Sequence, residues 1–333
     1  VGSGTINLTT SGASPITQSG SGALVANAGN LTVNTANSAV TLTPQSAAVN
    51  DVGTLNNVNT GNGAFTYTGN GSQNTLTVSG GTAGSLTVTN NNTASITGVI
   101  NVVNDIVARS VNKNVNATPA LVTSTAGGIT IRANEDISLQ GQFKAQDATK
   151  GNITLISDSK SITLAKDFLI GNTLTVQAGP GQTLELAKIV TNSITKQIGA
   201  KNVSLIADTI DFTNFTSATG TGTLSIAPRT AGNPMDIGTV GVATVGALTL
   251  NQNTLNTMTS FGTIDLGRTG SLALPASTGT AGAINVGSAN ITNANLNLFS
   301  NGSDNTKNSI TQSGALLLGG GAGTLGVITA GGN

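Results

Sequence analysis

Short segments in which aliphatic and polar residues alternate recur along the whole chain. Examples are "TLTV" at Thr75, "SLTV" at Ser85, "NITL" at Asn152 and "NVSL" at Asn202. Alternation with a period of two residues is typical of a β-strand that buries one face. Turn-forming Gly, Asn, Asp and Ser separate the segments, and no stretch keeps apolar residues at helical spacing over three turns. The sequence therefore predicts an all-β chain with no substantial helix.

The spacing of these segments indicates how they pack. Successive members follow one another at steps of roughly 20–29 residues, and a period in the twenties with two or three short strands is typical of a solenoid. One family begins at Ile129, Ile153, Leu174, Val203, Leu224, Leu248 and Leu272, and a second begins at Ile137, Ile162 and Leu184. Each turn buries its apolar face only against the next turn. We expect a right-handed parallel β-helix, or β-solenoid.

We expect one continuous solenoid over residues 1–333. The segment 101–128 departs from the regular rhythm, which suggests an irregular excursion or a boundary there. Most charged residues lie between Asp105 and Asp211, and signs alternate over residues 133–167. Such a pattern is typical of a solvated face with mixed charges. A polar docking face for a partner is the alternative.

The composition fits a thin core. Aromatic residues are 2% of the chain and charged residues 8%, whereas hydrophobic residues are 37%. The core must therefore consist mainly of aliphatic side chains, because few large rings are present. On the outside, stacked like charges would repel, so uncharged Thr, Ser and Asn suit the outward positions. The formal net charge is zero and no basic patch is present, so we expect no nucleic-acid partner. No apolar run is long enough for a transmembrane segment.

Several kinds of chemistry are excluded by residue type. The chain has no His and no Cys, which excludes Ser-His-Asp and Cys-His catalysis, disulfides and thiolate metal sites. The close carboxylate pairs are Glu135/Asp136 and Asp208/Asp211. Adjacent residues at a strand start point to opposite faces, and we expect the second pair to straddle a corner. Neither pair matches the two facing acids that glycoside cleavage requires.

Other motifs are equally weak. The stretches "GGGAGTLGV" at Gly319 and "GGTAGSL" at Gly80 lack the Lys-Ser/Thr ending of a phosphate-binding loop. The calcium-binding nonapeptide of other β-solenoids does not occur. Thr-x-Thr pairs such as Thr66/Thr68 and Thr87/Thr89 would bind ice only if one pair stacked in every turn, and their spacing is irregular. We therefore expect no catalytic, cofactor-binding or metal-binding residues, no cofactor and no enzyme activity.

The repeats resemble those of a known group of proteins. The phrases "AGGITIRANEDISLQGQ" at Ala126, "GNITLISDSKSITLA" at Gly151 and "SITQSGALLLGGGAGTLGVITAGGN" at Ser309 look like repeats of filamentous-haemagglutinin-type exoproteins. These are large β-helical adhesins of Gram-negative bacteria, secreted by two-partner systems or as autotransporter passengers. The similarity runs over nearly the whole chain, without a match to the family's N-terminal secretion domain. It implies a right-handed β-helix at the bacterial cell surface or outside the cell, and an outer-membrane secretion partner.

One phrase occurs twice. "PITQSGSGALVANAGNLTV" at Pro15 aligns without a gap with "SITQSGALLLGGGAGTLGV" at Ser309. Either the chain is an excerpt of a longer array or this is a favoured turn sequence. Neither end resembles a polar cap, which favours an excerpt or a polymer.

Three functions follow as hypotheses. The first is a non-enzymatic extracellular adhesin or surface-fibre segment that binds a cell-surface or matrix ligand, protein or glycan, in attachment or biofilm structure. The second is a self-assembling filament or surface-layer subunit whose partner is its own copies. The third is a β-helical protein that binds or cleaves glycans.

Overall fold

Two compact units make up the chain in the computed structural model. Unit 1 is Val1–Ser157 with Leu169–Gly171, and unit 2 is Asp158–Phe168 with Asn172–Asn333. The structure describes residues 4–19, 22–26, 29–44, 49–69, 75–118, 120–166, 168–186, 197–267, 281–291, 295–300, 309–318 and 323–329. Each unit is a parallel β-solenoid, and the described residues form about 11 turns of about 24 residues. The predicted all-β solenoid is thereby confirmed, and its right-handed sense stays a prediction.

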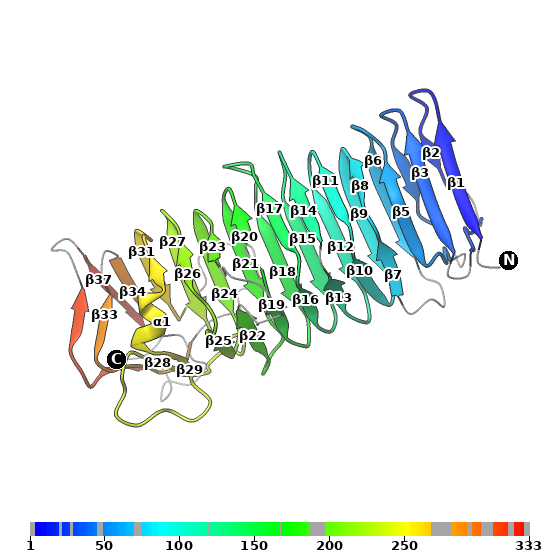
Figure 1. Cartoon of the computed structure of the whole chain (residues 1–333). Coiled ribbons are helices and arrows are strands. Elements are labelled where there is room, and N and C mark those ends of the chain that lie inside the picture. Colours follow the sequence, from blue (N-terminus) through cyan, green and yellow to red (C-terminus); the bar gives the residue numbers. More distant parts are fainter. Residues whose placement is uncertain are drawn as a thin grey trace. The chain divides into compact units, whose positions relative to one another are not determined.

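Unit 1 begins with two strands per turn and continues with three. Its first face consists of β2 (Ile16–Thr17), β4 (Val40–Leu42), β6 (Ala64–Gly69), β9 (Ser85–Asn90), β12 (Ile106–Ser110), β15 (Ile129–Ala133) and β18 (Ile153–Ser157), which run side by side (Figure 1). The long strands β1 (Thr5–Thr10), β3 (Asn30–Thr35) and β5 (Thr54–Asn59) complete the early turns. The second face then continues as β7 (Thr75–Val78), β10 (Thr93–Ile96), β13 (Val115–Ala117) and β16 (Ile137–Leu139). The third face comprises β8 (Gly81–Ala83), β11 (Val99–Val102), β14 (Leu121–Ser124) and β17 (Gln142–Ala145).

The core of unit 1 is a set of aliphatic columns. Ile106, Ile129 and Ile153 pair in register on three successive turns, and each is at most 2% exposed. This is the alternation that the sequence predicts, since every second residue of these strands points inward. Rings also enter the core, because Phe65 and Tyr67 of β6 are fully buried. Burial raises the pKa of Tyr67 far above its usual value.

The segment 101–128 consists of regular strands in the structure. It contains β12, β13 and β14, and the end of β11. These strands pair in parallel with β8–β10 before them and with β15, β16 and β17 after them. The segment therefore has the same three strands per turn as its neighbours.

Unit 2 repeats this arrangement and adds two smaller sheets. Its first face is β21 (Thr173–Gln177), β24 (Asn202–Ile206), β27 (Thr223–Ala227), β31 (Thr263–Leu266), β34 (Asn295–Ser300) and β37 (Leu325–Thr329). The other main-sheet strands are β19 (Ile162–Leu164), β22 (Thr183–Leu186), β25 (Thr209–Asp211), β23 (Gln197–Gly199), β26 (Ser217–Thr219) and β30 (Met258–Thr259). The smaller sheets contain β28 (Met235–Ile237), β29 (Leu248–Leu250), β32 (Ile284–Val286), β35 (Ile310–Gln312), β33 (Ala289–Ile291) and β36 (Leu316–Leu318). Strand β20 (Phe168–Ile170) is shared between the units, because Phe168 belongs to unit 2 and the other two residues belong to unit 1.

The predicted strand families hold in part of unit 2. Leu174, Val203 and Leu224 pair in register, as expected. The next partner is Ile264 and not Leu248, which lies in β29 and pairs with Met235. The prediction for Leu248 was therefore wrong, because the chain between β27 and β31 forms separate strands before it returns to the first face. Leu272 lies outside the described residues.

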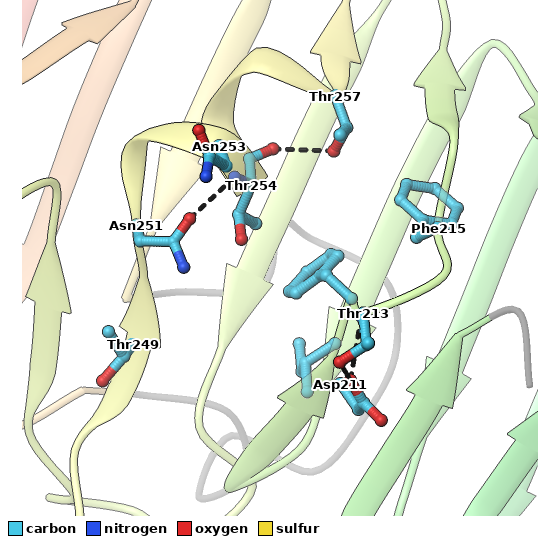
Figure 2. A pocket seen from close by; sticks show the side chains of 10 residues that line it. Asp211, Thr213, Phe215, Thr249, Asn251, Asn253, Thr254 and Thr257 are labelled. Carbon is cyan, nitrogen blue, oxygen red and sulfur yellow. Dashed lines mark hydrogen bonds between the residues drawn. The ribbon is translucent and has the colours of Figure 1, made fainter.

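The helix α1 (Gln252–Asn256) is the only helix among the described residues. Asn251 is its N-cap, and its Oδ1 accepts a hydrogen bond of 2.9 Å from the Thr254 N–H. The expectation of no substantial helix is confirmed. This helix lines a pocket of unit 2 (Figure 2).

A buried amide ties together the first turns of unit 1, and this gives a first testable prediction. Asn50 is fully buried, and its Nδ2 donates to the carbonyl oxygens of Leu42 and Thr68 at 3.0 and 3.2 Å. A carboxylate cannot donate, so Asn50→Asp would leave both acceptors facing a buried charge. We expect a loss of about 2 kcal/mol in the free energy of unfolding.

Chemical denaturation followed by circular dichroism checks this value. The matched control is Asn101→Asp at an exposed position in β11, where the change should stay within about 0.5 kcal/mol. Equal losses in the two variants would show that Asn50 has no special role.

Candidate functional site

The first of the two carboxylate pairs, Glu135/Asp136, lies in a bend between two strands. Glu135 and Asp136 immediately precede β16. Glu135 Oε1 forms an ion pair of 3.2 Å with Lys113 Nζ on the preceding turn, and both side chains are substantially exposed. The Asp136 N–H donates to Asn114 Oδ1 at 3.0 Å. These contacts join neighbouring turns and give the pair a structural role.

The second pair is split between two environments. Asp208 lies at the corner between β24 and β25 and is 7% exposed, whereas Asp211 ends β25 and is exposed. Asp208 accepts hydrogen bonds from Gly181 N–H, Thr230 N–H, the Thr230 hydroxyl and Asn233 Nδ2, at 2.6, 2.8, 2.6 and 2.9 Å. Asp208 therefore has a structural role, because it joins neighbouring loops by hydrogen bonds. Asp211 is the member of the pair that remains available to a ligand.

Asp211 lines a pocket of unit 2. This pocket has a volume of about 480 Å³. Its lining comes from two segments of the chain, and the residues are Ile210, Asp211, Phe212, Thr213, Phe215, Thr249, Asn251, Asn253, Thr254 and Thr257. Figure 2 shows Asp211, Thr213 and Phe215 on one side, and Asn251, Asn253 and Thr254 with α1 on the other. The volume lies within the range of about 300–1,000 Å³ that is typical of small-molecule sites.

The sequence "DFTNF" shapes the first side of the pocket. Asp211 Oδ1 accepts hydrogen bonds from the Thr213 N–H at 2.9 Å and from the Thr213 hydroxyl at 2.5 Å. This side-chain-to-backbone turn is typical of Asp after a strand. Both bonds favour the ionised form and lower the pKa of Asp211. The Phe215 N–H then donates to the Phe212 carbonyl oxygen at 3.0 Å, which closes the segment into a compact turn.

Two aromatic rings stand in this turn. The rings of Phe212 and Phe215 pack edge to face, with 5.9 Å between their centroids and 66° between their planes. Phe215 is 9% exposed, whereas Phe212 is more exposed and borders the pocket. The buried ring therefore supports the outer one, in a geometry that aromatic pairs prefer.

The opposite side carries amides with unused hydrogen-bonding capacity. Asn251 uses its Oδ1 to cap α1, and its Nδ2 has no hydrogen bond within the described residues. The Asn253 side chain likewise forms no hydrogen bond within that part of the chain. The second oxygen of Asp211, Oδ2, is also unbonded there. The pocket thus offers both donors and acceptors beside an aromatic ring.

Sequence reasoning missed Phe212, Asn251 and Asn253 as functional candidates. A signal was present, because two of the seven Phe residues lie within "DFTNF" in a chain that otherwise has few rings. The partners on the α1 side carried no such signal, since Asn is common throughout the chain.

The described parts of the two Gly-rich stretches contribute to strands. "GGTAGSL" contains β8 and the start of β9, and "GGGAGTLGV" ends in β37, with residues 319–322 outside the described part. Gly81 has φ +158°, and a Cβ there would lie 2.2 Å from the Val58 carbonyl oxygen. The glycine permits close packing against the preceding turn.

The outward residues form ladders of limited length. Thr41, Thr66 and Thr87 pair in register on successive turns, but the next position is Val107. The Thr66/Thr68 and Thr87/Thr89 pairs therefore stack on neighbouring turns only. Asn and Thr side chains also bond between turns, as where the Thr82 hydroxyl donates to Asn59 Oδ1 at 2.9 Å.

A turn in the charged segment gives a second testable prediction, on pH dependence. Asp147 Oδ1 accepts hydrogen bonds from the Thr149 N–H, the Thr149 hydroxyl and the Lys150 N–H, at 2.8, 2.8 and 2.7 Å. These bonds, with the Lys150 N–H first, lower the pKa of Asp147 from 3.8 to about 2. A depressed folded-state pKa stabilises the fold above the unfolded pKa and loses this effect as pH falls. The turn should therefore loosen between pH 3.8 and about 2.

NMR titration of the Asp147 carboxyl checks this. Thr149→Val removes the hydroxyl donor and keeps the N–H, so it should raise the pKa of Asp147 toward 3.8. A titration at the ordinary Asp value in the unmodified protein would contradict the prediction.

Two further findings concern the described residues only. They contain no group of three or more acidic side chains placed to hold a metal ion. Their helical structure also lacks the length and apolar character that crossing a bilayer requires.

Comparison with known proteins returns no match. No protein-family model matches the chain, and neither does a curated protein or a solved structure. The fold and the pocket therefore carry the functional argument.

Proposed function

We propose that this protein is a non-enzymatic adhesin or surface-fibre segment that acts outside the cell, at a bacterial surface, in attachment or matrix structure. The observation that carries the proposal is the stacking of uncharged polar side chains on in-register parallel strands, as in the Thr41–Thr66–Thr87 ladder. Stacked turns present repeated surfaces that suit binding to large partners. The resemblance of the repeats to filamentous-haemagglutinin-type exoproteins supports the same function and a secretion partner in the outer membrane.

The side-chain bonds between turns add to this argument. The Ser79 hydroxyl donates to Asn56 Oδ1 at 3.0 Å, and the Thr82 hydroxyl donates to Asn59 Oδ1 at 2.9 Å. Outward polar groups therefore help to hold the turns together, which makes the outer surface rigid. A rigid, weakly charged surface can bind another surface with an affinity that depends little on salt concentration.

An attachment assay tests the proposal. Beads coated with the purified chain are incubated with epithelial cells and with immobilised matrix proteins and polysaccharides. We expect attachment that rises with coating density and is inhibited by the soluble chain. Absence of attachment to every surface, or turnover of a polysaccharide by the chain, would overturn the proposal.

Electron microscopy of the purified chain separates the polymer alternative. Rods that lengthen with concentration, without any other ligand, would place the function in self-assembly. Separate particles at all concentrations, together with bead attachment, would support an adhesin.

A further inference from the structure

We propose that the pocket between β25 and α1 in unit 2 binds a neutral pyranose unit of a glycan. This inference rests on the proposed function, because it names the ligand class of the adhesin and the residues that hold it. The pocket is bounded by Asp211, Phe212 and Phe215 on one side and by Asn251 and Asn253 on the other.

The arrangement of apolar and polar groups matches a sugar ring. A pyranose presents C–H groups on its faces and hydroxyl groups around its rim, so it needs an aromatic surface with hydrogen-bonding groups at the edge. Phe212 supplies the ring surface, and Phe215 holds it in place by edge-to-face packing. Small-molecule sites commonly combine such an apolar surface with a few placed polar groups.

The polar groups at the edge can bond both ways with hydroxyls. Asp211 Oδ2 is an acceptor without a partner in the described residues, and Asn251 Nδ2 is a donor in the same condition. Asn253 supplies one further donor group and one acceptor. A sugar hydroxyl both donates and accepts, so it can satisfy a neighbouring carboxylate and amide together.

The charge of the pocket selects a neutral sugar. Asp211 is the charged residue in the lining, and the described lining contains no Lys or Arg. The hydrogen bonds from Thr213 lower the pKa of Asp211 and keep it ionised near neutral pH. Sialic and uronic acids would therefore meet an unpaired like charge, which disfavours them.

A glycan array followed by calorimetry tests the inference. The probes are neutral oligosaccharides that end in hexose or N-acetylhexosamine, with sialylated and uronic-acid oligosaccharides for comparison. We expect neutral probes to bind and anionic ones to bind at least about tenfold more weakly. Asp211→Asn, Phe212→Ala and Asn253→Ala should each weaken binding by about tenfold or more.

Two matched variants guard against general effects. Asn256→Ala removes the same side chain from the other end of α1, outside the pocket lining, and should leave binding unchanged. Phe212→Tyr keeps a ring at the same position and should retain most of the binding that Phe212→Ala loses. Thermal unfolding confirms that each variant is folded.

The outcomes separate this inference from the proposed function. Binding that survives all three pocket variants, or is absent from every glycan, overturns the site. The bead assay can still succeed in that case through a protein ligand. Cleavage of a bound glycan would instead overturn the non-enzymatic function while leaving the pocket as its sugar site.

Discussion

Replacing Asp208 with alanine should destabilise unit 2 by about 3–5 kcal/mol, because four donors would lose a charged acceptor in a buried place. Two of these donors are the backbone N–H groups of Gly181 and Thr230, whose directions are fixed by the chain. The other two are side-chain groups of Thr230 and Asn233. The carboxylate of Asp208 therefore joins its own corner to two other loops, one at Gly181 and one at residues 230–233.

Hydrogen exchange measured by mass spectrometry checks this prediction locally. Peptides that cover β24 and β27 should exchange faster in Asp208→Ala, by an amount that corresponds to the lost free energy. Asp208→Asn keeps the size of the side chain and two of its acceptor sites, so it should fall between alanine and the unmodified protein.

Asp211→Ala is the matched control, since it removes the same residue type three positions along the chain. Asp211 is exposed and, among the described residues, its side chain bonds to Thr213 alone, so its loss should cost no more than about 1 kcal/mol. Equal losses of stability in the two variants would contradict the view that Asp208 has a structural role and Asp211 does not. Changing Asp211 to Asn is predicted to weaken glycan binding, so stability and binding should respond to different carboxylates.

The solenoid could be predicted from the sequence because the pattern that specifies each strand is local and recurs in every turn. In-register parallel strands place similar residues on top of each other, so Ile106, Ile129 and Ile153 occupy one column. The alternation within each strand and the step between strands are both visible in the sequence.

Pairing partners were harder to predict where the step changes. Leu224 is followed by an alternating segment at Leu248, which continues the earlier spacing but belongs to another sheet. Alternation indicates that a segment is a strand and does not specify which strand lies beside it. The longer connection between β27 and β31 therefore could not be found from spacing alone.

The roles of the acids also required the structure. Asp236 drew no attention in the sequence, yet it is fully buried and accepts hydrogen bonds from the Thr244 N–H and hydroxyl at 2.7 and 2.9 Å. A buried acceptor and an exposed ligand group are the same residue type in a sequence. Their different environments arise only in the folded chain, where segments distant in sequence, such as 210–215 and 249–257, lie together.

Phe143→Ala should be the most damaging truncation of unit 1, with a loss of about 3–5 kcal/mol. Phe143 lies in β17, is fully buried, and pairs in register with the fully buried Val122 of β14. Most of the core consists of aliphatic side chains, and the regular strands leave little room for the backbone to collapse into a ring-sized cavity. Phe143→Leu fills most of the space and should cost about 1.5 kcal/mol or less.

The loss should be local, because each turn of a solenoid is stabilised mainly by its neighbours. Hydrogen exchange should therefore speed up most in β14 and β17, and least in β1 and β3 of the same unit. Lys144→Ala changes the adjacent, outward position and should stay within about 0.5 kcal/mol. Uniform acceleration through unit 1 after Phe143→Ala would instead show that the unit unfolds as a single cooperative block.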